Sequence, residues 1–211
     1  MIHELRVYTL WPGKVPEFLK LAEERAMKIR GDDYGKLLGY WFSEFGPLNQ
    51  VFHLWEYADL NARQEARAGL GKNEEWRRDY VAHVQPLMRN QEIRLMNPQK
   101  PIGNIQGSGN IYEFRHYKAR IGKAPAFLKN FVDIMPVREK YSPNVGIWHT
   151  EAALPNELSH MWAYPSLNAR FEARAELNKD PAWQGFLKEN GGNLEEMHSS
   201  VLIPAAFSPL R

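Results

Sequence analysis

Two histidines, each followed two residues later by a tryptophan, are the side chains of this sequence best suited to chemistry near neutral pH. His53 precedes Trp55, and His160 precedes Trp162. An imidazole gains or loses its proton between about pH 5 and 8. We therefore predict that His53 or His160 acts as an acid or base if the protein is an enzyme. The alternative is that each is a hydrogen-bonded histidine of the core.

A Glu-x-Arg-x-Tyr segment precedes each histidine, at residues 4–8 and again at residues 113–117. An arginine can pair with a carboxylate or an enolate, and a nearby glutamate can fix the direction of the guanidinium. Arg6 and Arg115 are therefore predicted to hold an anion. The alternative is that glutamate and arginine neutralise each other in the core.

Further acidic and aromatic residues are predicted to share the lining with these arginines, because strand periodicity places them on the same faces. The remaining predicted ligand-binding residues are Glu4, Tyr8, Trp41, Trp55, Tyr57, Glu113, Tyr117, Trp148, Trp162 and Tyr164. Tryptophan and tyrosine offer stacking surface to a ring. This lining suits a small hydrophobic or aromatic anion. If the aromatic residues instead fill the interior, the protein is a non-catalytic interaction module.

These candidates recur because the sequence is duplicated. The segment LNARQEARAGL at 60–70 corresponds to LNARFEARAEL at 167–177, and the two copies stay aligned at an offset of 109 before a short gap and 107 after it. Each copy is too long for a solenoid repeat. We predict a first domain at residues 1–98, a linker at 99–110 and a second domain at 111–211.

Each copy has the pattern strand, helix, hairpin, helix, strand. Alternating residues open it, Pro16 suits the first turn of a helix, and residues 37–44 and 50–57 form a predicted hairpin. This order is typical of a ferredoxin-like α+β unit. The predicted fold is a pair of tandem ferredoxin-like repeats packed sheet to sheet as a pseudo-twofold dimeric α+β barrel. We expect the aliphatic sheet faces to meet the helices and the polar-aromatic faces to line the space between the sheets.

The hairpins GYWFSEFGPLNQVFHLWEY (39–57) and GIWHTEAALPNELSHMWAY (146–164), with the Arg-bearing helices that follow, resemble the NIPSNAP family in both halves of the chain. The resemblance implies the dimeric α+β barrel, ferredoxin-like fold. It implies little about chemistry, because the family has no well-defined activity. Some members are associated with mitochondria and with vesicle or protein-interaction roles.

Composition excludes several classes of function. The chain has 211 residues, a formal net charge of +2 and no cysteine. So small a charge does not indicate nucleic-acid binding, and without cysteine there is neither a disulfide nor a thiolate site. The histidines lack the neighbouring ligands of a zinc site, and no dinucleotide or phosphate-binding motif is present. We therefore predict no metal and no tightly held cofactor, with a haem-binding barrel kept as an alternative.

Location and assembly are predicted from the same sequence. The first residues form a strand pattern without a leader signal, and no apolar run reaches the length of a membrane span. We expect a cytoplasmic protein. A homo-oligomer is possible.

Overall fold

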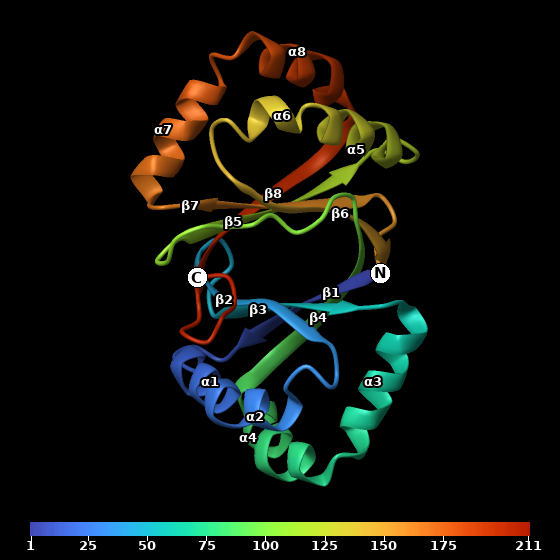
Figure 1. Ribbon diagram of the computed structural model, residues 1–211, viewed down its shortest axis with the longest axis vertical. Coiled ribbons are helices and arrows are strands. Elements are labelled where there is room, and N and C mark those ends of the chain that lie inside the picture. The colour runs from blue at the N-terminus through green and yellow to red at the C-terminus, as the bar shows by residue number, and fades with distance from the viewer. The chain divides into compact units, whose positions relative to one another are not determined.

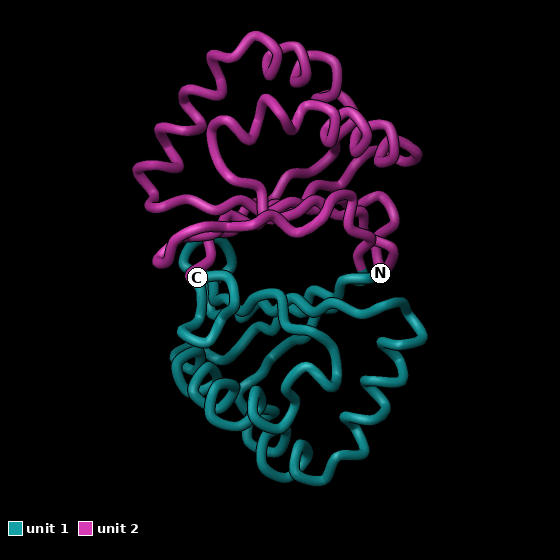
Figure 2. Tube along the Cα trace, in the orientation of Figure 1, with its two compact units in different colours: residues 1–95, 204–211 teal, residues 96–203 magenta.

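The computed structural model describes residues 1–211, and the chain divides into two compact units (Figure 2). Unit 1 consists of Met1–Leu95 and Pro204–Arg211, and unit 2 consists of Met96–Ile203. The units therefore differ from the predicted domains, because residues 99–110 belong to unit 2 and residues 204–211 belong to unit 1. Both units combine an antiparallel sheet with helices on one face of that sheet (Figure 1).

The first repeat has the predicted order of strand, helix, hairpin, helix, strand, with two π-helical stretches (η1, η2) and a short 3-10 turn (η3). Its elements are β1 (Ile2–Leu10), α1 (Val15–Leu21), η1 (Ala22–Ala26), α2 (Met27–Arg30), β2 (Lys36–Phe45), β3 (Gln50–Tyr57), α3 (Leu60–Lys72), η2 (Trp76–Val81), α4 (Ala82–Val84), η3 (Gln85–Leu87) and β4 (Met88–Pro98). The strands lie in the order β4-β1-β3-β2. Strands β1 and β3 are antiparallel, with Arg6 opposite His53.

The second repeat has the same order without π-helical stretches. Its elements are β5 (Ile111–Ala119), α5 (Ala124–Asp133), α6 (Met135–Arg138), β6 (Asn144–Ala152), β7 (Glu157–Tyr164), α7 (Leu167–Leu177), α8 (Pro181–Asn190), the 3-10 turn η4 (Gly191–Asn193) and β8 (Leu194–Pro204). The strand order β8-β5-β7-β6 matches that of the first repeat. The predicted α+β class, built from two ferredoxin-like repeats, is confirmed.

Side-chain caps explain where the helices after each hairpin begin. The Asp59 carboxylate accepts a hydrogen bond of 2.8 Å from the Ala62 amide, and the Ser166 hydroxyl accepts one of 3.1 Å from the Ala169 amide. Both satisfy an amide that the first helical turn leaves without a partner. None of the helices is both long and apolar enough to cross a membrane.

The predicted assignment of sheet faces is wrong. Tyr8, Tyr40 and Val51 of the first sheet pack in one core cluster with Phe18 of α1 and Tyr80 of η2. The helices therefore cover the polar-aromatic face, and the aliphatic residues of β1 and β3 point to the other side. The physical reason is that the helices themselves carry arginines that complete the hydrogen bonds of this face, which the period of a single strand does not reveal.

Candidate functional site

A cavity lies between the sheet and the helices in each unit. The cavity of unit 1 has a volume of about 200 Å³, and strands β1 and β3 line it with Arg6, Tyr8, His53 and Trp55. The cavity of unit 2 has a volume of about 170 Å³ and is lined by the equivalent residues Arg115, Tyr117, His160 and Trp162. The structure thus brings these eight predicted site residues together as two matching groups of four.

In each cavity a tryptophan fixes the protonation of the histidine. The Trp55 Nε1–H donates to His53 Nδ1 at 2.5 Å, and Trp162 donates to His160 Nδ1 at 2.6 Å. An indole nitrogen can only donate, so Nδ1 must accept, and a neutral imidazole then carries its proton on Nε2. The Nε2 atoms of His53 and His160 have no hydrogen-bond partner, although the residues are only 6% and 3% exposed. Each cavity is therefore lined by a histidine whose buried Nε2–H has no partner.

The surroundings keep both histidines neutral. Burial, followed by the charges of Arg6 and Arg30, lowers the pKa of His53 well below its ordinary value. Burial and then Arg115 act in the same direction on the pKa of His160. Because the Nδ1 lone pair is occupied and Nε2 is protonated, the imidazole is placed to donate a hydrogen bond. This arrangement disfavours the acid or base role expected from the sequence.

Glu4 forms a buried ion-pair network behind the first cavity. Its carboxylate accepts a hydrogen bond of 2.9 Å from Arg6 and another from Arg63 of α3, and the Arg6 Nε–H donates to the Tyr8 hydroxyl at 2.5 Å. Burial would raise the pKa of the Glu4 carboxyl, but Arg6 and then Arg63 lower it below its usual value. Glu4 is therefore ionised and holds Arg6 in place, rather than lining the cavity.

Glu113 repeats this network in unit 2. It accepts from Arg115 at 2.8 Å, from Arg170 at 2.6 Å and from the Ser199 hydroxyl at 2.8 Å. Burial raises its pKa, but these partners outweigh burial and bring the pKa of Glu113 to about 2. The alternative in which glutamate and arginine neutralise each other therefore describes Glu4 and Glu113. Arg6 and Arg115 form these ion pairs and also line the cavities.

Two further arginines line each cavity and have no carboxylate partner. Arg30 lies over the Trp55 ring, 3.3 Å from its centroid, and donates to the Tyr57 hydroxyl at 2.9 Å. Arg67 of α3 is half-buried and its guanidinium has no hydrogen-bond or ion-pair partner. Burial, followed by the charge of Arg6, lowers its pKa. The cavity of unit 1 therefore holds excess positive charge.

Unit 2 reproduces these two arginines as Arg138 and Arg174. Arg138 lies 3.8 Å from the Trp162 ring centroid and donates to Tyr164 at 3.1 Å, and the Arg174 guanidinium has no partner. These four arginines were not predicted from the sequence as site residues. The duplication of the LNAR segments contained the signal for Arg67 and Arg174, which follow the glutamate-binding arginine by one helical turn.

The remaining predicted site residues lie outside the cavities. Trp41 and Trp148 point to the opposite sheet face, where their rings cover Gly39 and Gly146 so closely that an added Cβ would collide with them. Tyr57 and Tyr164 stand behind the cavities as hydrogen-bond acceptors for Arg30 and Arg138. These tryptophans and tyrosines are packing and positioning residues.

The two repeats of the structure correspond to two matches of one family model. The model of the NIPSNAP family matches residues 3–101 and 112–209. The chain belongs to the NIPSNAP family. Human protein NipSnap homolog 3A is 30% identical, in an alignment covering 100% of this chain and 86% of the relative. The NipSnap homolog of Dictyostelium discoideum is 28% identical, covering 96% and 87%.

Among solved structures, a putative monooxygenase from Lactobacillus acidophilus is similar over the full NIPSNAP chain. It has a TM-score of 0.70 and 13% identity, covering 100% of this chain and 98% of that chain. At this identity the similarity shows the fold alone. It supports the α+β fold inferred from the sequence.

Proposed function

We propose that this protein binds small hydrophobic or aromatic anions, one in the cavity of each repeat. The observation that carries the proposal is the pairing, in each cavity, of an unpartnered histidine Nε2–H with an arginine that has no carboxylate partner. A buried donor without a partner is costly, and a ligand acceptor would remove that cost.

The chemistry of the lining selects the ligand. A carboxylate or enolate oxygen can accept from His53 Nε2–H and from Arg67, and charge-assisted hydrogen bonds of this kind are the stronger ones. Trp55 and Tyr8 provide flat apolar walls for the body of the ligand. His160, Arg174 and Trp162 supply the same groups in unit 2. An anion with a planar apolar body satisfies all of these groups together.

Catalysis is a second candidate function. Donors that hold a carboxylate also stabilise an enolate as it forms. Cofactor-free oxygenation of a bound enolate is a reaction of this class, and the fold is shared with a protein described as a putative monooxygenase. The present geometry supports binding of the anion more directly than proton transfer by histidine.

The haem alternative does not fit the donor set. An axial histidine must offer the Nε2 lone pair and therefore carry its proton on Nδ1. In both cavities the Nδ1 atom accepts a hydrogen bond from a tryptophan N–H. In the tautomer that haem requires, two N–H donors would face each other without an acceptor. The same argument applies to any metal held through Nε2.

We also propose a cytoplasmic location and assembly into a homo-oligomer. Cell fractionation would test the location, and light scattering would test the assembly. An interaction module whose aromatic residues fill the barrel also remains an alternative, because the cavities of about 200 and 170 Å³ lie between each sheet and its own helices.

The experiment that tests the proposal compares 2-naphthoate with its uncharged analogue 2-naphthamide by isothermal titration calorimetry. We expect the carboxylate to bind about ten- to a hundredfold more tightly, the value of one or two charge-assisted hydrogen bonds. Arg67→Met combined with Arg174→Met should remove this preference. Arg78→Met is the control, because the Arg78 side chain is 73% exposed and lies outside both cavities. Equal binding of the two compounds to the unaltered protein would contradict the proposal.

A further inference from the structure

The ring that packs on the histidine comes from a different element in each cavity. In unit 1, Tyr40 of β2 stacks on His53, with centroids 4.9 Å apart and planes at 9°. The equivalent strand residue in unit 2 is Ile147, and Phe131 of α5 contacts His160 instead, at 4.8 Å and 55°. The counterpart of Phe131 in unit 1 is an alanine. The exchange keeps an aromatic ring beside the histidine but removes its hydroxyl.

A second hydroxyl is lost from the lining of the cavity. Tyr80 lines the first cavity, where it packs against Phe18, and Phe186, which packs against the equivalent Phe127, takes its place in the second. Tyr40 and Tyr80 thus add two phenolic hydroxyls to the lining of the first cavity. A phenolic hydroxyl can donate one hydrogen bond and can also accept. The first cavity therefore has a neutral donor in addition to its cationic and imidazole donors.

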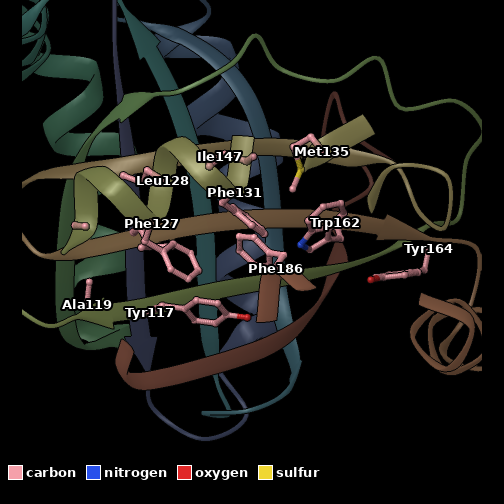
Figure 3. Close-up of a cluster of buried hydrophobic side chains, with 12 residues drawn as sticks. Tyr117, Ala119, Phe127, Leu128, Phe131, Met135, Ile147, Trp162, Tyr164 and Phe186 are labelled. Carbon is pink, nitrogen blue, oxygen red and sulfur yellow. The ribbon is translucent and has the colours of Figure 1, made fainter. Parts of the chain in front are cut away.

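The second cavity has a hydrocarbon wall at the corresponding place. Phe127, Phe131 and Phe186 gather beside Tyr117 (Figure 3), with the centroids of Phe127 and Phe186 5.7 Å apart and those of Phe131 and Phe186 5.8 Å apart. The Tyr117 hydroxyl already accepts a hydrogen bond from Arg115 at 2.6 Å. A polar group on the body of a ligand would meet phenylalanine rings here.

The backbone differs as well. The stretches η1 and η2 of unit 1 are π-helical, and they contribute Ala26, Trp76, Tyr80 and Val81 to the first cavity. The equivalent stretches of unit 2 lie at the junction of α5 and α6 and in α8, without a π-helical turn. π-Helical turns are rare and often occur at functional sites. The two cavities have therefore diverged in backbone geometry as well as in side chains.

We infer that the two cavities select different anions: the first takes an aromatic anion whose body carries a hydroxyl or carbonyl group, and the second takes an anion whose body is entirely hydrocarbon. This inference rests on the proposed function, since it assumes that each cavity holds an anion through its histidine and arginines. Tyr40 and Tyr80 determine the specificity of the first cavity. Phe131 and Phe186 determine that of the second.

The test uses proteins that each retain one working cavity. Arg174→Met leaves the first cavity and Arg67→Met leaves the second, and each is titrated with 2-naphthoate and 6-hydroxy-2-naphthoate. In the first cavity the hydroxylated compound should bind about three- to tenfold more tightly, the value of one net hydrogen bond. In the second cavity the order should be reversed by about tenfold or more, because a buried hydroxyl without a partner is costly. Tyr80→Phe should remove the preference of the first cavity without unfolding the protein.

The outcomes separate the inference from the proposed function. If both single-cavity proteins bind 2-naphthoate but show the same ratio for the two compounds, the inference is wrong and the proposed function stands. If Phe186→Tyr gives the second cavity a preference for the hydroxylated compound, the inference is supported independently. If neither compound binds the unaltered protein, the proposed function fails, and this inference fails with it.

Discussion

At the scale of single residues, the tryptophan two positions after each histidine decides what the imidazole can do. The hydrogen bonds from Trp55 to His53 and from Trp162 to His160 occupy Nδ1. A histidine fixed in this way is a neutral donor whose remaining N–H has no partner within the protein. The cationic neighbours reinforce this state, because they disfavour a second proton on the ring.

The first prediction concerns stability and pH. The pKa values of His53 and His160 are lower in the folded protein than the ordinary value of 6.5. The unfolded chain therefore binds more protons below about pH 6.5, and stability falls as the pH falls through this range. Each histidine should contribute a slope of up to about 1.4 kcal/mol per pH unit. Urea unfolding at pH 7.5 and 5.5 measures this loss.

The matched variant is His53→Asn combined with His160→Asn, which keeps an acceptor for each tryptophan but does not titrate. Its stability should change less between the two pH values than that of the unaltered protein. Glu113 does not interfere, because its pKa of about 2 makes its contribution full above about pH 4.5 and lost only as the pH falls toward 2. Equal slopes for the two proteins would show that the histidines are not buried as neutral groups.

At the scale of helices and strands, the sequence predicted the elements better than their faces. Period two in β1 and β3, the turn residues of the hairpin and the cap at Asp59 are local signals, and the structure confirms the elements that they predict. The side of the sheet that meets the helices depends on Arg30 and Arg63, which come from other elements and pair with the strands only after folding. The π-helical stretches of unit 1 also have no simple sequence period.

The strand residues of the candidate site could be predicted from the sequence, but its helix residues could not. His53 and Arg6 could be recognised because their strand spacing and residue types are local. Arg30 and Arg67 could not be assigned, because charge on a helix is usually solvated and only packing shows otherwise. Trp41 was misplaced because its neighbours in sequence are aromatic on both faces.

The second prediction concerns the strand β6. Gly146→Ala should destabilise the protein by about 1–3 kcal/mol, because the new Cβ would collide with the Trp148 ring on the same strand. Gly185→Ala in α8 is the matched control. It meets no atom within 4 Å, so it should stabilise the helix by about 0.5–1 kcal/mol. Urea unfolding of the two variants should give changes of opposite sign, and similar changes would contradict the packing described for Trp148.

At the scale of the whole molecule, the end of the chain contributes to the first repeat. Residues 204–211 belong to unit 1. The Ala205 amide donates to the Tyr40 carbonyl at 2.9 Å, the Tyr40 amide donates to the Ser208 hydroxyl at 2.9 Å, and the Phe207 ring lies 4.8 Å from that of Tyr40. Because Tyr40 also lines the first cavity, this segment helps to position a wall of that cavity.

The third prediction tests this link. Ser208→Ala should leave the buried Tyr40 amide without an acceptor and cost about 1–3 kcal/mol of stability. It should weaken 2-naphthoate binding in the Arg174→Met protein, which retains the first cavity, and leave binding unchanged in the Arg67→Met protein. Ser108→Ala, at an exposed position, is the control. Equal weakening at both cavities would indicate a general loss of stability instead of a local effect on Tyr40.

If the duplication produced two anion sites in one chain, the number of anions bound per chain tests this most directly. Isothermal titration with 2-naphthoate should give about two tight sites per chain in the unaltered protein, one in Arg67→Met, one in Arg174→Met and none in the double variant. The double variant should keep only weak binding, equal for 2-naphthoate and 2-naphthamide. The reason is that Arg67 and Arg174 are the unpaired cations of separate cavities. A single site in the unaltered protein, or a site number that neither substitution changes, would contradict the account.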